Sequence, residues 1–473
     1  MRRSSVIGPM LLIAVGLLFL VHNVWPEVPI VELVSQYWPF LLILWGGLRL
    51  IEILYWAMAG RPLPRSGISG GEWVFVIFLC LIGSSMYTAK HVVGWLPNAR
   101  SLRGMVISMS ETYDYDIAAA GKTSEKPVRV VIENFRGNAR ITGDDTNQVT
   151  ITGRKTVRAF QQSEADKANT ETPVEVIPQG DEIIIRTNQD HVSDSMRVSD
   201  DLEIKIPRGA SLEAHGRDGD FDVRDLQGSV DLTSDSSGVR IDNIGGSVRV
   251  EVHKSDIVRA TGVKGTVELK GKGQDVDFEN IDGQVTVNGD FLGQIQMKNL
   301  AKPSSFNGAH VDLQFEKLPG QLHMGLGDFR ADNISGPIHL NSKARDVVIT
   351  DFTQSLDLTL DRGDIELKPS LKGPLPKMDV RTRSGDIDLA LPADAKFELR
   401  MVADHGEAHN EFGSPLVVEE QERGATIAGT IGTGPQLHLE SERGTITVRK
   451  ASADDADKDK DKDKDEELKV EKQ

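Results

Sequence analysis

The chain has 473 residues, a formal net charge of −17 and one cysteine, Cys80. A surface this acidic argues against nucleic acid as a partner, because phosphate backbones are bound by Lys and Arg. A single cysteine excludes an intramolecular disulfide and leaves too few thiols for a zinc or iron–sulfur cluster.

Three apolar segments open the chain, at residues 6–24, 38–57 and 73–89. Each has 17–20 residues, enough for a helix to cross about 30 Å of hydrocarbon. No small-x-small cleavage site follows the first segment, so we do not expect it to be removed as a signal peptide. The sequence therefore predicts a membrane anchor over residues 1–95, with three transmembrane helices in the lipid bilayer.

The charges around these segments predict which side of the membrane each loop occupies. Arg2 and Arg3 precede the first segment, and Arg61 and Arg65 lie between the second and the third. Cytoplasmic loops are enriched in Lys and Arg, so these residues indicate a cytoplasmic amino terminus. We expect everything after Lys90 to lie outside the cytoplasmic membrane.

Two ionisable residues, Arg49 and Glu52, lie within the second segment. Their spacing of three places them on one helical face. An ionisable residue at membrane depth is a candidate functional site, although an arginine near the end of a span can also extend to the interface. We favour a role in anchoring over a role in transport.

The run from Gly8 to Val24, the short acidic loop after it, and the run from Tyr37 to Ile43 resemble a known family. They are similar to the LiaI–LiaF-like transmembrane region of bacterial envelope-stress proteins, over roughly residues 5–58. The resemblance implies a bacterial envelope protein. It also implies a possible partner, a membrane sensor kinase that the transmembrane hairpin would regulate.

The next part of the chain is irregular. Residues 96–127 are mixed and polar and predict a linker. Residues 128–143 have the alternating pattern of a first layer of strands, after which the regular spacing is lost. Because the open end of a strand stack exposes unpaired backbone groups, we assign residues 144–210 to an irregular amino-terminal cap.

A short repeated phrase then returns about every 18 residues: an apolar residue, any residue, and glycine or a polar substitute. It occurs at Leu226–Gly228, Ile244–Gly246, Val263–Gly265, Ile281–Gly283, Leu318–Gly320, Ile334–Gly336 and Phe352–Gln354. Apolar residues alternate on both sides of the phrase, as in strands with one buried face. One unit cannot bury that face alone, so successive units must stack.

The sequence therefore predicts an all-β fold over residues 128–449, preceded by the three transmembrane α-helices. This fold is a single parallel β-solenoid, or β-helix, with ~18-residue coils. The repeat degenerates at residues 294–309, where we expect a bulge or a loop. Corner glycines such as Gly246 are expected to adopt a backbone conformation that a Cβ would hinder.

A column of aspartates precedes the strands of the repeat. Its members are Asp220, Asp256, Asp275, Asp328, Asp346, Asp364 and Asp386. Such a column could bind cations, but aspartate also caps turns by accepting hydrogen bonds from its own backbone. We favour the capping role.

The repeat region also resembles a known family. The runs Asp201–Gly209, Gly219–Val223, Leu226–Gly228 and Glu442–Ile446 are similar to the bacterial putative-adhesin domain of unknown function. The resemblance covers about residues 128–448. It implies a β-solenoid at the cell envelope, and it implies no catalytic residues.

One candidate metal site is the group His405, Glu407 and His409. In an extended strand these three side chains point the same way and could capture a metal weakly. The zincin motif instead requires a helix and a different position for the glutamate. We therefore assign no metal-binding residue.

One candidate catalytic group is Arg381, Arg383 and Asp386, which could meet on one surface as in a carbohydrate-active β-helix enzyme. Surface ion pairing explains them as well, and aromatic residues make up only 5% of the chain. No nucleophile elbow, phosphate-binding loop or dinucleotide fingerprint occurs in a suitable context. We therefore expect no enzyme activity and assign no catalytic residue, cofactor-binding residue or cofactor.

Residues 450–473 contain a run of alternating Asp and Lys, from Asp457 to Asp465, which is typical of a disordered tail. The whole sequence favours a non-enzymatic, multi-pass protein of the bacterial cytoplasmic membrane. Its acidic β-solenoid would be extracytoplasmic (periplasmic or at the cell surface) and would bind an envelope protein or a glycan, as in adhesion. Two alternatives remain: regulation of a sensor kinase through the transmembrane hairpin, and a carbohydrate-active β-helix enzyme.

Overall fold

The computed structural model describes residues 111–122, 129–192, 197–371 and 373–451, with isolated positions at 43, 46, 47, 51, 58, 77 and 80. The chain divides into two compact units. The first comprises Met1–Tyr113 and Arg158–Lys167, and the second comprises Asp114–Val157 and Ala168–Gln473. The second unit contains the repeat region and is described below.

The prediction of three transmembrane helices is wrong. The one α-helix whose bounds the described residues give is α5 (Gln162–Glu171), with 10 residues. A helix of this length spans about 15 Å, half the hydrocarbon thickness of a bilayer. Among the described residues, no helix is both long and apolar enough to cross a membrane. Apart from the isolated positions, the predicted spans at 6–24, 38–57 and 73–89 lie outside the described residues, as do Arg49 and Glu52.

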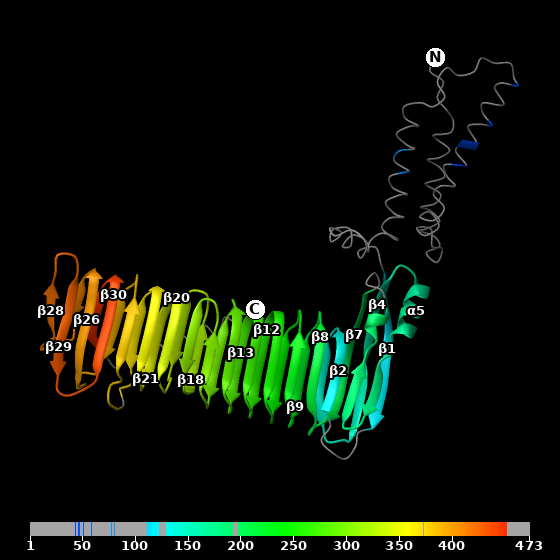
Figure 1. The fold of residues 1–473 in the computed structure, drawn as a ribbon, viewed down its shortest axis with the longest axis horizontal. Coiled ribbons are helices and arrows are strands. Elements are labelled where there is room, and N and C mark those ends of the chain that lie inside the picture. The colour runs from blue at the N-terminus through cyan, green and yellow to red at the C-terminus, as the bar shows by residue number, and fades with distance from the viewer. Residues whose placement is uncertain are drawn as a thin grey trace. The chain divides into compact units, whose positions relative to one another are not determined.

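The second unit is built from strands that form two opposed faces (Figure 1). In spatial order, the first face holds β5 (Glu175–Gln179), β6 (Glu182–Arg186), β2 (Arg129–Arg136), β8 (Ser211–Arg217), β10 (Val230–Ser234), the starts of β12 (Val248–Val263) and β13 (Val267–Ile281), β14 (Val285–Phe291), β16 (Ser304–Asn307), β17 (Val311–Phe315), β20 (Ile338–Ala344), β22 (Leu356–Arg362), β24 (Met378–Thr382), β30 (Gln436–Arg443), β26 (Phe397–His405), β29 (Ala425–Ile431) and β28 (Val417–Glu420). The second face holds β1 (Glu111–Lys122), β4 (Gln148–Ala159), β7 (Arg197–Pro207), β3 (Ala139–Asp144), β9 (Phe221–Leu226), β11 (Val239–Ile244), the ends of β12 and β13, β15 (Ile295–Leu300), β18 (Leu318–Met324), β19 (Asp328–Asp332), β21 (Asp346–Phe352), β23 (Ile365–Pro369), β25 (Ile387–Leu391), β31 (Ile446–Lys450) and β27 (Ala408–Asn410). A 3₁₀ turn, η1 (Gln189–His191), precedes β7.

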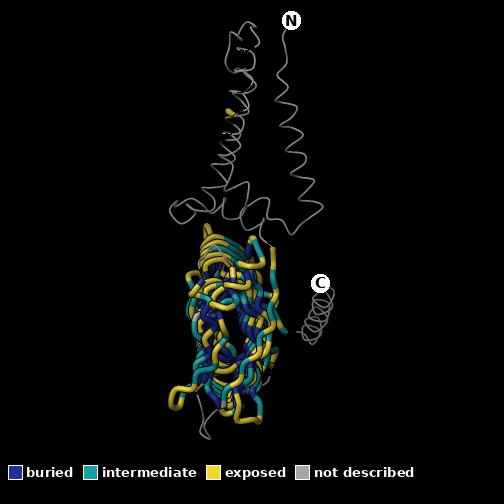
Figure 2. The backbone as a smooth tube through the Cα atoms, turned by 90° about the vertical axis from the view of Figure 1, so that its right-hand side faces the viewer, coloured by how far each residue is buried: buried dark blue, intermediate teal, exposed yellow. Residues whose placement is uncertain are grey.

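The stacking of coils follows the predicted apolar columns. Val230 lies beside Val248, Val248 beside Val267, and Val267 beside Val285, each one coil further along the chain. All four side chains are buried between the two faces, and Figure 2 shows the buried positions lining the interior of the stack. Branched side chains suit such a pleated, covered surface. The β-solenoid-like repeat is thereby confirmed.

One coil runs in the opposite direction to the others. Strand β17 is antiparallel to both of its neighbours, β16 and β20. On the other face, β18 is likewise antiparallel to β15 and β19. The prediction of a wholly parallel solenoid is therefore wrong for residues 311–324. It is also wrong at the carboxy-terminal end, where β29 is antiparallel to both β26 and β28. Alternation of apolar residues reads the same in both chain directions, so the sequence pattern could not reveal the reversal.

Both ends of the stack contain an inserted coil. At the amino-terminal end, the pair β2–β3 lies between β6–β7 and β8–β9. At the carboxy-terminal end, β30–β31 lies between β24–β25 and β26–β27. The last strands of the domain therefore hold together coils that precede them in the chain.

The corner glycines are required for space. A Cβ on Gly283 would collide with the backbone oxygen of Gly265 in the preceding coil. At Gly283 and most equivalent glycines the expectation of a special conformation is wrong, because the left-handed conformation belongs to the residue three positions earlier, Asn280 with φ 56°. At Gly336, with φ 93°, the expectation is confirmed. Equivalent left-handed residues are Asp225, Asn243, Gly262, Asn299, Asn333 and Asp351. Asn and Asp tolerate this conformation better than other residues that carry a Cβ.

Candidate anion-binding pocket

The aspartate column links neighbouring coils. The Asp364 carboxylate accepts a hydrogen bond from the backbone N–H of Asp386 at 2.8 Å, and the Asp386 carboxylate accepts one from that of Thr445 at 2.6 Å. Asp220, Asp275 and Asp346 make the same kind of bond to the next coil. The carboxylates thus cap backbone donors, as favoured from the sequence, but mainly those of the next coil. Within the described residues, no cluster of three or more His, Cys, Asp or Glu could hold a metal ion.

The residues His405, Glu407 and His409 do not lie on one strand. Strand β26 ends at His405 and β27 begins at Ala408, so a corner separates the two histidines. The ring Nδ1 of His405 lies 3.3 Å from the backbone oxygen of Glu442, whereas His409 Nε2 lies 3.5 Å from a carboxylate oxygen of Glu407. The shared orientation expected for an extended strand is therefore lost.

The structure gives Arg381, Arg383 and Asp386 separate partners. Arg381 forms an ion pair with Asp379 on its own strand at 3.3 Å. Arg383 faces Asp361 of the preceding coil at 3.9 Å. Asp386 bonds to backbone, as described above. Arg383 also lines a pocket.

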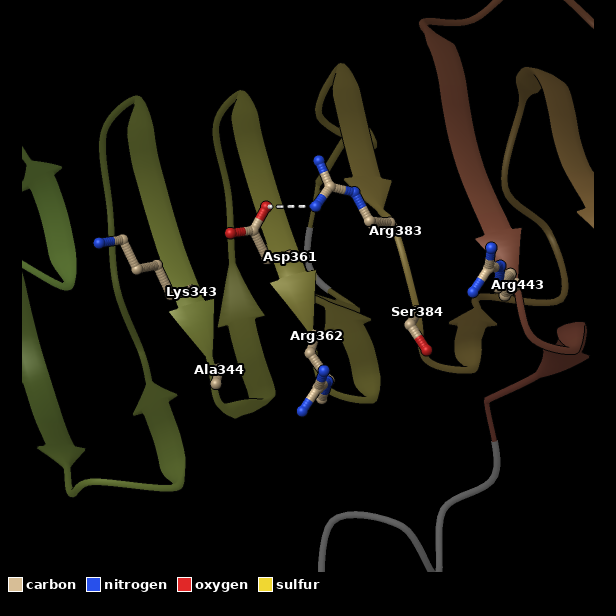
Figure 3. Close-up of a pocket in the computed structure, with 7 residues that line it drawn as sticks. All are labelled: Lys343, Ala344, Asp361, Arg362, Arg383, Ser384 and Arg443. Carbon is tan, nitrogen blue, oxygen red and sulfur yellow. Dashed lines mark ion pairs between the residues drawn. The ribbon is translucent and has the colours of Figure 1, made fainter.

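This cationic pocket has a volume of about 400 Å³ and lies at the corners that follow the first-face strands. Its lining comprises Lys343, Ala344, Asp361, Arg362, Arg383, Ser384 and Arg443. Figure 3 shows Arg383 facing Asp361, with Arg362, Ser384 and Arg443 on successive corners. The lining side chains come from four coils that are consecutive in space, those of β20, β22, β24 and β30.

Tight stacking of the corners brings these side chains together. Gly363 and Gly385 follow the lining residues and have φ of 135° and 151°. A Cβ on Gly385 would collide with the backbone oxygen of Gly363, so glycine lets successive corners approach closely. The insertion of β30 beside β24 adds Arg443, which is distant from Ser384 in sequence. Sequence neighbours alone would not have placed it there.

The charge of the pocket is opposite to that of the chain. Four cationic side chains and one carboxylate line it, in a protein with a net charge of −17. Among the described residues, no carboxylate forms an ion pair with Lys343, Arg362 or Arg443. Guanidinium groups present planar, forked donors that match carboxylate and phosphate oxygens. The pocket can therefore bind an anionic group.

Sequence reasoning missed Lys343, Arg362 and Arg443. A signal was present, because an arginine precedes the corner glycine at Arg362–Gly363 and again at Arg443–Gly444. These two pairs are far apart in the chain and become meaningful only once the coils are known to stack.

Residues 129–449 match the family model of the Toastrack DUF4097 domain. The chain belongs to this family. The resemblance of the repeat region to the putative-adhesin domain is thereby confirmed, so the protein carries an adhesin-like Toastrack domain of unknown function. Nothing supports the resemblance of residues 5–58 to a LiaI–LiaF-like transmembrane region. No curated protein matches the chain.

Several solved structures are similar to the Toastrack protein at low identity. A "putative cell adhesion protein" from Clostridium sporogenes ATCC 15579 is 7% identical, with 72% of this chain and 100% of that chain covered and a TM-score of 0.16. A "putative adhesin" from Parabacteroides distasonis ATCC 8503 is 9% identical, with coverages of 72% and 97% and a TM-score of 0.17. A "putative lipid binding protein" from the same organism is 10% identical, with coverages of 71% and 97% and a TM-score of 0.17. These TM-scores are too low to support an argument, so the family assignment depends on the family match alone.

Proposed function

We propose that this Toastrack protein is a non-enzymatic binding protein of the bacterial cell envelope. Its β-solenoid lies outside the cytoplasm and holds an anionic envelope glycan through the cationic pocket. The observation that supports this proposal is a group of three cations, Lys343, Arg362 and Arg443, without ion-pair partners among the described residues of an acidic chain.

The lining of the pocket favours binding over glycoside hydrolysis. Glycosidases ordinarily use two carboxylates on opposite sides of the bond that is cleaved. Asp361 is the one carboxylate among the residues that line this pocket, and it already faces Arg383. The remaining cations are suited to holding negative charge.

The geometry of the stack favours a polymer over a small anion. Arg362 and Arg443 occupy corners two layers apart, on either side of Ser384, so their backbones are separated by about 10 Å. An exposed ion pair contributes about 0.2–1 kcal/mol, so one contact would bind weakly. A polymer with repeated carboxylates can engage several cations at once and gain avidity.

The test measures binding of the full chain to immobilised polygalacturonate, with neutral dextran as the control polymer. The double variant Arg362→Gln/Arg443→Gln should bind polygalacturonate about tenfold more weakly, because two ion pairs of about 0.7 kcal/mol each are lost. The matched control is Arg330→Gln/Arg400→Gln, which removes the same charge from exposed positions outside the pocket. Equal losses in the two double variants, or equal binding to dextran, would refute the proposal.

A further inference from the structure

A second and smaller pocket, the apolar pocket, lies where the reversed coil meets the regular stack. Its volume is about 130 Å³. It is lined by Gly289, Asp290, Phe291, Leu292, Phe306, Gly308, Ala309, His310, Val311, Leu326, Lys343, Ala344 and Arg345. It shares Lys343 and Ala344 with the cationic pocket.

The reversal of the coil creates the apolar pocket. The tight turn between β16 and β17 and the turn between β18 and β19 replace the regular corners at this level. These turns do not stack on the corners of the neighbouring coils as a regular corner would. The side chains at those corners are therefore left uncovered. Leu292 is 47% exposed and Leu326 is 69% exposed, whereas Phe291 and Phe306, which also line the pocket, are buried.

Arg345 forms a charged wall of this pocket and is only 8% exposed. Its Nε donates a hydrogen bond to the backbone oxygen of Gly325 at 2.8 Å, and Nη1 donates to Ser342 Oγ at 2.9 Å. Nη1 also lies 3.4 Å from the backbone oxygen of His310. Among the described residues, Nη2 makes no hydrogen bond and no carboxylate forms an ion pair with the guanidinium.

A buried cation without a counter-ion is unfavourable, because burial removes its hydration. Burial accordingly lowers the pKa of Arg345, and the charge of Asp328 opposes that shift only in part. At the equivalent corner position, the following coils have Gly363, Gly385 and Gly444, so the stack itself does not require an arginine here. An anion in the pocket would supply the missing counter-charge.

We propose that the apolar pocket binds a small apolar monocarboxylate. The carboxylate accepts hydrogen bonds from Nη2 of Arg345, and the carbon body lies against Phe291, Phe306 and Leu326. This ligand is distinct from the anionic glycan of the proposed function, which contacts the cationic pocket.

The size and lining of the pocket select this class of ligand. An apolar protein cavity of about 150 Å³ holds benzene, so 130 Å³ accommodates about six carbon atoms. The rings of Phe291 and Phe306 meet edge to face, with centroids 6.5 Å apart. A sugar would bury hydroxyl groups against these rings without hydrogen-bond partners, which is unfavourable. A short acyl chain has no such groups.

The test compares hexanoate with 1-hexanol, which has a similar carbon body and no charge. Ligand-observed NMR titrations of the full chain should give at least tenfold tighter binding of hexanoate, as expected for a charge-assisted hydrogen bond. In Arg345→Met this preference should disappear. If both ligands bind the unmodified chain equally well, or if hexanoate does not bind, the proposal is wrong.

A second variant tests the apolar wall without disturbing the hydrogen bonds of Arg345. Leu326→Ser should weaken binding of both ligands at least threefold. Leu371→Ser is the matched control, because Leu371 is 60% exposed and lies outside the pocket. Equal effects of the two leucine variants would overturn the proposal. Arg362→Gln/Arg443→Gln should leave hexanoate binding unchanged, so failure of the glycan proposal and failure of this one are distinguishable.

Discussion

A buried carboxyl group in the amino-terminal coils makes a quantitative prediction about pH. Asp200 on β7 is fully buried, and Lys155 on β4 is 2% exposed. Gln189 donates a hydrogen bond to Asp200 Oδ2 at 2.9 Å, and Lys155 Nζ donates to the backbone oxygen of Thr172. The other carboxyl oxygen, Asp200 Oδ1, is buried and has no hydrogen-bond partner among the described residues. Ionising this carboxyl is therefore costly.

The size of the effect follows from the pKa. Burial raises the pKa of Asp200 to about 7, although the charge of Lys155 and the hydrogen bond from Gln189 act in the opposite direction. An unfolded aspartate has a pKa near 4, and each pH unit of difference corresponds to about 1.4 kcal/mol. Because the folded pKa is the higher one, the contribution of Asp200 is fully present below about pH 4 and is lost as pH rises through about 7. The total loss is about 4 kcal/mol.

The assay is hydrogen exchange of the β7 amides in the full chain between pH 4 and pH 8, corrected for the intrinsic exchange rate. Hydrogen exchange is suitable because it reports local opening, and stacked repeats can open locally. In Asp200→Asn the loss of protection with rising pH should largely disappear. The control Asp201→Asn changes an exposed neighbour and should shift the profile only slightly, because the charge of Asp201 is the smallest of the causes that act on the pKa of Asp200. If the β7 amides of the unmodified chain become more protected as pH rises, or if Asp200→Asn retains the full loss, the reasoning is refuted.

Three further predictions concern the stack. Gly283→Ala should destabilise the domain by about 1–3 kcal/mol in thermal unfolding followed by circular dichroism, because the new Cβ would meet backbone atoms. The control Gly327→Ala has open space around its Cβ and should change stability little. Equal destabilisation by the two substitutions would contradict the close-packing argument. In the same measurement, Asn280→Val should lower the stability of the domain by about 1–2 kcal/mol more than Asn280→Gly. Both variants lose the hydrogen bond from Asn299, but only valine disfavours the left-handed backbone conformation at this position. Equal stability of the two variants would show that the conformation is not strained. Removal of residues 436–473 should sharply lower exchange protection in β26 and leave that of β14 intact, because it removes β30 and leaves β26 paired with β29 alone. Unchanged protection of β26 in the truncated chain would contradict the inserted topology.

Much of the repeat architecture could be predicted from the sequence. The recurrence of apolar residues every 18 or so positions predicted stacked coils, and the register of Val230, Val248 and Val267 follows that recurrence. The reason is physical: a strand with one apolar face must bury it, and an identical strand one coil away is the nearest cover. The aspartate column could also be found in the sequence. Its hydrogen bonds to the backbone of the next coil, such as the one that Asp364 accepts from Asp386, could not be predicted.

The prediction of three transmembrane helices rested on local patterns alone. Length and hydropathy are properties of a segment, and they predicted spans at 6–24, 38–57 and 73–89 that the described residues do not support. The corner glycines are a second example. Their regular recurrence predicted a special backbone conformation. At Gly283 the structure instead shows a need for space, because a Cβ there would collide with the backbone of Gly265 in the neighbouring coil.

The sequence by itself determined that the domain is a stack of alternating strands, because alternation and period are written along the chain. Only the tertiary structure decided the direction of the coil at 311–324 and the insertion of β30–β31, because an apolar alternation is unchanged by reversing or reordering strands. Both pockets depend on those two features. The insertion brings Arg443 to the cationic pocket, and the reversed coil leaves Arg345 buried beside an open apolar space.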